Sequence, residues 1–166
     1  MSKSEQNLKD AFAGESQANR KYLAFAKKAE AEGYKNVAKL FRAAAAAETI
    51  HAHNHLRELG GVKSTAENLR EAINGESYEF LQMYPRMIAD ATAESNGKAL
   101  RTFNFANEVE KVHAALYKKA LDELGTGTSK DVKYYVCTVC GYTIEGKAPD
   151  SCPVCKAGKV AFMLAE

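Results

Sequence analysis

A helical segment occurs twice in this 166-residue chain. Residues 7–16 read NLKDAFAGES and residues 68–77 read NLREAINGES, so ten positions align at an offset of 61, with six identities and two like-charge exchanges. With one residue inserted, the alignment continues and pairs Glu48 with Glu110 and His51 with His113. Two copies are too few for a solenoid, whereas two helical pairs suit one bundle. The repeat therefore predicts a mainly α fold built on a four-helix bundle.

Apolar residues recur at helical spacing through about the first 125 positions. Glycines and short polar stretches divide this region. The expected helices cover residues 5–32, 36–59, 66–94 and 98–124. Pro85 falls within the third and should bend or interrupt it. The segment between the second and third helices must cross the bundle if all four helices share one core.

The chain changes character after the helical region, where short strands and turns fit better than helix. We expect a bundle domain over residues 1–127 and a small domain over residues 128–166. Such a short tail buries little apolar surface and needs a cross-link, such as a metal site, to fold stably. Its two CxxC pairs, eleven residues apart, strongly predict a tetrahedral thiolate metal site. The expected ligands of that site are Cys137, Cys140, Cys152 and Cys155. On spacing alone, zinc and iron fit equally well.

The repeated acidic and histidine residues of the helical region form a second candidate metal site. Residues three positions apart lie on one helix face, so each Glu-x-x-His can bind a metal from one side. A di-iron site in a bundle takes such a pair from each of two helices and a glutamate from each of the others. A lone Glu-x-x-His is a weak signal, but its repetition favours the metal interpretation. The candidate ligands are Glu15, Glu48, His51, Glu76, Glu79, Glu110 and His113.

Electrostatics supports this second site. Converging carboxylates would repel one another and lose hydration, so they require cations or protons. Oxygen and imidazole ligands suit iron or manganese. A di-iron site that turns over also needs electrons, which zinc does not carry. The neighbouring bundle site therefore favours iron at the four cysteines, although zinc can substitute there.

Composition argues against several other classes of protein. The net charge is only +2 and the basic residues are dispersed, which argues against a nucleic-acid binder. No stretch approaches the roughly 18 apolar residues of a membrane span, and the first ten residues resemble no signal peptide. Clustered rather than dispersed cysteines favour a metal site over a disulfide framework. We therefore expect a cytoplasmic protein without membrane contact.

Over nearly its whole length the sequence resembles the rubrerythrin family, with a ferritin-like bundle and a rubredoxin-like tail. The matching segments are Ala13-Gly-Glu-Ser-Gln-Ala18, Glu48-x-x-His51, Gly75-Glu-Ser-Tyr-Glu79, Met83-Tyr-Pro85, Glu110-x-x-His113, Cys137-x-x-Cys140-Gly-Tyr and Cys152-Pro-x-Cys155. The resemblance implies a carboxylate-bridged di-iron centre that reduces hydrogen peroxide to water, with one thiolate-bound iron relaying electrons. It also implies that Glu79 and His51 exchange at one iron, and that Glu79, Tyr22 and Tyr84 act close to the reaction.

The resemblance further implies partners. Electrons would come from a separate nicotinamide-linked reductase or from a rubredoxin. A head-to-tail homodimer would set each cysteine domain beside the partner's di-iron site rather than its own, and helices could be exchanged between chains. Val109 stands where some relatives carry an acid, away from the expected ligand face. His53 and His55 are expected to lie outside the ligand set.

Two other functions share parts of this pattern. A ferritin-like iron oxidase or storage protein would use the same carboxylates, but it has no need of a thiolate relay and requires a large cage. A non-enzymatic zinc-ribbon adaptor on a helical scaffold would be colourless and hold zinc.

Overall fold

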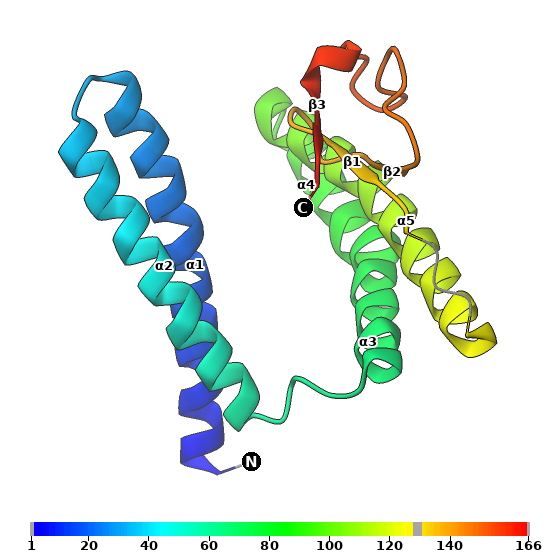
Figure 1. The fold of residues 1–166 in the computed structure, drawn as a ribbon. Helices are drawn as coiled ribbons and strands as arrows, with labels where there is room; N and C mark the ends of the chain where they lie inside the picture. The colour runs from blue at the N-terminus through cyan, green and yellow to red at the C-terminus, as the bar shows by residue number, and fades with distance from the viewer. Residues whose placement is uncertain (1, 128–130, 166) are drawn as a thin grey trace. The chain divides into compact units, whose positions relative to one another are not determined.

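The computed structural model describes residues 2–127 and 131–165. The chain forms two compact units, Met1–Lys63 and Ser64–Glu166, and each is described by itself (Figure 1). The four helical stretches expected from the sequence all form, and each of their ends lies within two residues of the expected position. No helix of the described residues has the length and apolar character needed to cross a membrane.

The first unit is an antiparallel pair of helices, α1 (Lys3–Ala31) and α2 (Lys35–Glu58). The Ser2 side chain accepts a hydrogen bond from the Glu5 N–H and caps α1. Gly33, at φ +87°, allows the chain to reverse between the helices. Alanines line the seam, and Ala26, Ala38 and Ala45 are at most 1% exposed. These small side chains let the two helices approach closely.

A buried asparagine fixes the register of this pair. Asn19 Nδ2 donates to Ala45 O at 2.7 Å and to Thr49 Oγ1 at 2.8 Å. A buried amide that finds such partners offsets the cost of its desolvation. Asn19 lies one helical turn after Glu15, and Thr49 directly follows Glu48. The asparagine therefore sets the two glutamates opposite each other.

The second unit begins with an interrupted helical stretch. It consists of α3 (Thr65–Tyr78), a single π-helical turn η1 (Glu79–Met83) and α4 (Tyr84–Ala93). A capping box between Ser64 and Glu67 starts α3. Pro85 occupies the first turn of α4, where its missing N–H is tolerated. The expected interruption therefore occurs, and its form is a π turn.

The π turn explains the inserted residue in the internal repeat. The two copies align at an offset of 61 before this turn and of 62 after it. A π turn accommodates one extra residue within a helix, and such turns are frequent at functional sites. Beyond the turn the packing repeats: ring centroids lie 6.1 Å apart for Tyr22 and Phe41 and 6.3 Å apart for Tyr84 and Phe103.

The long helix α5 (Gly97–Thr126) packs along α3 and α4 and carries the C-terminal strands (Figure 1). Three short antiparallel strands form one sheet in the order β2-β1-β3. Their bounds are β1 (Tyr134–Cys137), β2 (Thr143–Glu145) and β3 (Phe162–Leu164), with a 3-10 turn η2 (Lys159–Ala161) before β3. We call residues 131–165 the cysteine module. Its only buried residues are Cys137 and Cys152, so its core is the cysteine cluster itself.

Candidate metal centres

The first unit brings together the three donors expected from it. Glu15 comes from α1, and Glu48 and His51 come from successive turns of α2. His51 Nδ1 lies 2.9 Å from Glu48 Oε2 and 3.9 Å from Glu15 Oε1. One ligand atom from each residue lies within 4.8 Å of the others. We call Glu15, Glu48 and His51 the first donor cluster.

The second unit repeats this geometry with Glu76 from α3 and with Glu110 and His113 from α5. His113 Nδ1 lies 2.7 Å from Glu110 Oε2 and 3.8 Å from Glu76 Oε1. These atoms also lie within 4.8 Å of one another, and we call the three residues the second donor cluster. Corresponding distances in the two clusters agree within 0.2 Å. The sequence repeat is therefore also a repeat of donor geometry.

The carboxyl groups of the second donor cluster are partly buried and lie close to one another. Burial, the hydrogen bond with Glu110 and the charges of Glu110 and Glu79 raise the pKa of Glu76 to about 7. Burial and then the charge of Glu110 also raise the pKa of Glu79, although His113 opposes this. Without a cation, these carboxyl groups bind protons to avoid mutual repulsion. Their donor set suits a hard or borderline divalent ion such as ferrous iron.

Carboxyl contact also perturbs the first donor cluster. The hydrogen bond with Glu48, followed by burial, raises the pKa of Glu15. The same hydrogen bond and the contact with His51 lower the pKa of Glu48. Close contact of the two carboxyl groups therefore favours a proton or a cation between them. A bound cation relieves the repulsion in both clusters, so the residues fit the metals expected from the sequence.

The expected catalytic residues differ in their surroundings. Glu79 begins the π turn beside the second donor cluster and lies outside its three donors. Burial and the charges of Glu79, Glu110 and Glu76 raise the pKa of Tyr84, which places this phenol near the same cluster. Tyr22 packs against Phe25 and Phe41 in the first unit. The chemical roles of all three residues stay predictions.

Sequence reasoning missed one tyrosine. The pKa of Tyr117 is raised by burial and by the charges of Glu76 and Glu110, so it faces the second donor cluster. It lies one helical turn after His113, and this spacing could have indicated it. Neither His53 nor His55 belongs to a donor cluster.

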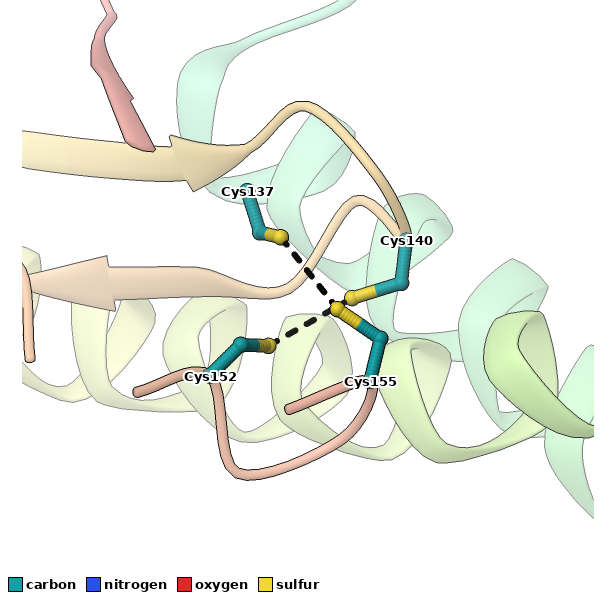
Figure 2. A group of neighbouring side chains, drawn as sticks. All are labelled: Cys137, Cys140, Cys152 and Cys155. Carbon is teal, nitrogen blue, oxygen red and sulfur yellow. Dashed lines mark hydrogen bonds between the residues drawn. The ribbon is translucent and has the colours of Figure 1, made fainter. Parts of the chain in front are cut away.

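The four cysteines of the module converge as expected (Figure 2). None forms a disulfide, and the Cys137–Cys155 and Cys140–Cys152 sulfur pairs are each 3.6 Å apart. A disulfide would place the sulfurs about 2.0 Å apart. Four sulfurs held about 2.3 Å from a central ion would be about 3.8 Å apart. The observed spacing thus fits tetrahedral metal binding.

Two backbone turns build this thiolate site. Gly141 and Lys156 follow the two CxxC pairs and have φ values of +85° and +65°. The glycine makes the first turn without strain. Burial opposes ionisation of Cys152, but N–H groups of Cys155 and Val154 and neighbouring thiols lower its pKa to about 7.

The remaining thiols show that the cluster needs a cation. Burial raises the pKa of both Cys140 and Cys155, and hydrogen bonds with Cys137 and Cys152 raise both further. Four adjacent sulfurs cannot all ionise without positive charge between them. A ferric or ferrous ion supplies that charge and the redox chemistry that zinc lacks.

One contact bears on the expected position of the module. We expected the module not to reach its own chain's di-iron site; within the second unit, Thr143 Oγ1 lies 2.9 Å from His113 Nε2. Val109 is only 2% exposed and packs against Gly141. A Cβ atom on this glycine would lie 3.8 Å from Val109 Cγ1. The module therefore packs on α5 of its own chain. The apolar Val109 makes this contact without burying a charge.

Comparison with known proteins gives consistent matches along the chain. A family model described as Rubrerythrin matches residues 6–121, and one described as Rubrerythrin, rubredoxin-like domain matches residues 135–163. The chain is 37% identical to Rubrerythrin-2 of Clostridium acetobutylicum, covering 93% of this chain and 92% of that protein. It is 39% identical to Nigerythrin of Nitratidesulfovibrio vulgaris, covering 95% and 84% of the two chains.

Comparison with solved structures agrees with these sequence matches. A solved structure described as the fully reduced, all-ferrous state of nigerythrin matches with a TM-score of 0.60 at 36% identity, covering 99% of this chain and 88% of that one. The expected fold class, mainly helical with a small four-cysteine strand domain, is confirmed. The chain also carries the residues of a di-iron carboxylate site and of a rubredoxin-like site, as expected.

Proposed function

Because this chain belongs to the rubrerythrin family, we propose that it reduces hydrogen peroxide to water at a di-iron centre. The observation that carries the proposal is the pair of matching donor clusters, each with two carboxylates and one imidazole. We assign Glu15, Glu48, Glu76, Glu79, Glu110 and His113 as iron ligands, with His51 exchanging against Glu79. Two bound ferrous ions supply the two electrons that, with two protons, convert one peroxide molecule into two waters.

The chain's own residues would hold and move the protons. Tyr84 keeps its phenolic proton at neutral pH because burial and the nearby carboxylates raise its pKa. Its hydroxyl can therefore donate a hydrogen bond to an oxygen at the second donor cluster. Glu79 also binds a proton more readily than an exposed glutamate. Glu79 is therefore the better candidate for a general acid at this cluster, and Tyr84 for a hydrogen-bond donor. We assign Tyr22 a similar role in the first unit.

The cysteine module would return the electrons. We propose that the four cysteines would hold an iron that supplies one-electron chemistry, with a nicotinamide-linked reductase or a rubredoxin as the donor. An iron held by four thiolates keeps its ligands in both oxidation states, so little rearrangement opposes the transfer. The homodimer and the cytoplasmic location stay predictions.

The test is anaerobic stopped-flow mixing of the fully reduced, iron-loaded chain with peroxide. We expect absorbance of the oxidised di-iron centre to appear orders of magnitude faster than free ferrous iron oxidises in the same buffer. Mixing with dioxygen should give a slower reaction. An oxidation rate equal to that of free ferrous iron contradicts the proposal. A faster reaction with dioxygen than with peroxide supports an iron oxidase instead.

A further inference from the structure

The histidines of the two donor clusters are held differently. In the second donor cluster, His113 Nε2 lies 2.9 Å from the Thr143 side chain at the start of β2, and Nδ1 faces Glu110. In the first donor cluster, His51 Nδ1 faces Glu48, but no hydrogen bond to His51 Nε2 is found among the described residues. The His51 side chain is 53% exposed, and that of His113 is 26% exposed. The internal repeat therefore preserves the donors and changes how one of them is held.

The direction of the Thr143 hydrogen bond follows from the protons available. The Thr143 hydroxyl donates its one proton to Gly141 O at 3.0 Å. Thr143 Oγ1 is therefore the acceptor toward His113, and Nε2 carries the proton of that hydrogen bond. A neutral imidazole that keeps its proton on Nε2 has an unprotonated Nδ1. Because Nδ1 is the atom that lies 2.7 Å from Glu110, the ring presents its metal-binding atom to the carboxylates.

The position of Thr143 depends on the ion in the cysteine module. The only buried residues of the described module are Cys137 and Cys152, so the module needs an ion among its four sulfurs to fold stably. The carbonyl that accepts the Thr143 proton belongs to Gly141, which directly follows Cys140. Thr143 is therefore held next to a cysteine ligand.

Two further contacts fasten the module to α5, one on each side of His113 in the sequence. Val109, one helical turn before His113, is 2% exposed and packs against Gly141. Lys119, further along the helix, forms an ion pair with Glu145 at the end of β2. The exposed ion pair contributes little by itself, so the apolar contact is the stronger of the two. Together they hold β2 against α5 at the level of the second donor cluster.

We propose that the cysteine module clamps the second donor cluster: with an ion on its thiolates, it holds Thr143 against His113 and so raises the affinity of this cluster for a divalent cation. Thr143 is a positioning residue, because it acts through His113. The inference rests on that part of the proposed function which makes the donor clusters metal sites. It involves no electron transfer and holds equally for iron and for redox-inert zinc in the module. The first donor cluster has no such contact, so its affinity should depend less on Thr143.

A zinc titration tests the clamp without any redox chemistry. Full-length protein with nitrogen-15-labelled histidine receives one equivalent of Zn²⁺, which the four thiolates bind first, and further Zn²⁺ is added against a competing chelator. NMR signals of His113 report binding at the second donor cluster, and those of His51 report binding at the first. Thr143→Val should weaken Zn²⁺ binding at His113 by about 10–100-fold, the usual effect of losing a partner that orients a metal-bound histidine. Binding at His51 should change less.

Two variants separate this hydrogen bond from general damage to the module. Thr143→Ser keeps the hydroxyl and should restore the affinity. Thr138→Val removes a hydroxyl that bonds Ala161 O inside the module, and it should leave the affinity unchanged. The His113 Nε2–H signal should be protected from solvent exchange in the unmodified chain and in Thr143→Ser, and should lose that protection in Thr143→Val. An unchanged Zn²⁺ affinity at His113 in Thr143→Val overturns the proposal.

Cys152→Ser tests the contribution of the module's own ion. This variant should weaken Zn²⁺ binding at His113 by a similar factor. Adding Thr143→Val to it should have little further effect, because both changes remove the same contact. Two effects that multiply would show that the module does not act through Thr143. With excess metal the second donor cluster still fills, so only its affinity changes.

Failure of the clamp and failure of the proposed function give different results. If the variants behave as expected but the iron-loaded, unmodified chain does not react with peroxide, the proposed function fails and the clamp stands. If the unmodified chain reduces peroxide and Thr143→Val binds Zn²⁺ at His113 as tightly as the unmodified chain, the clamp alone is wrong.

Discussion

Removal of the Glu110 carboxylate tests whether the second donor cluster binds metal. Glu110 Oε2 lies 2.7 Å from His113 Nδ1, and its side chain is 15% exposed. The ligand atoms of Glu76, Glu110 and His113 all lie within 4.8 Å of one another. A cation among them therefore lies close to all three groups. Glu110→Ala deletes one carboxylate and leaves the imidazole and Glu76 in place.

The magnitude follows from Coulomb's law. Two unit charges about 4 Å apart interact by about 4 kcal/mol at an effective dielectric constant of about 20. A loss of about 4 kcal/mol lowers a binding constant by roughly 1,000-fold, and a divalent ion loses more. Part of this loss is recovered, because deleting Glu110 lets the pKa of Glu76 fall from about 7 and frees it to bind metal. We therefore expect iron affinity to fall by roughly 100- to 1,000-fold.

The assay is anaerobic ferrous titration against a competing chelator. Glu108→Ala is the matched control, because Glu108 is on the same helix, is 54% exposed and pairs with Lys111. The control should keep the affinity of the unmodified chain, and both variants should keep the thiolate iron. If Glu110→Ala binds iron as tightly as Glu108→Ala, the second donor cluster is not a metal site and the reasoning fails.

Two further predictions concern the cysteine module and the effect of pH. Cys152 is fully buried, and we expect Cys152→Ser to lose the thiolate-to-iron absorption and keep the di-iron spectrum. The control Ser151→Ala should keep both. Absorption spectra with metal analysis would show the difference. In metal-free protein, the raised pKa of Glu76 means that the folded state binds more protons than the unfolded state between pH 4.5 and about 7. Stability should therefore fall as pH rises through this window. A melting temperature that rises or stays level over the same window would contradict the raised pKa of Glu76. Iron should reverse this trend, because deprotonated ligands bind it better.

The sequence predicted those features that depend on local spacing. Helix ends, the Glu-x-x-His pairs and the CxxC pairs all follow from short-range periodicity and turn residues, and the structure reproduces them. The repeat also showed that one residue is inserted in the second copy. It did not indicate a π turn, because the choice between a π turn and a loop depends on packing around Glu79 and Tyr84.

Contacts between distant segments were beyond sequence reasoning. Thr143 and His113 are separated by thirty residues, and no periodic pattern connects a strand residue to a helix residue. The seating of Gly141 on Val109 likewise depends on where the module packs. The expected boundary between residues 127 and 128 stays a prediction, and residues 128–130 lie outside the described part of the chain.

Mössbauer spectroscopy of the iron-57-loaded chain tests the central claim most directly, that the protein holds a di-iron centre and a separate thiolate-bound iron. The account predicts about three irons per chain. Two of them, when oxidised, form a magnetically coupled pair with oxygen and nitrogen ligands, and the third has the spectrum of an iron bound by four thiolates. Isolated, uncoupled irons in the helical region, or iron only at the cysteines, would contradict it.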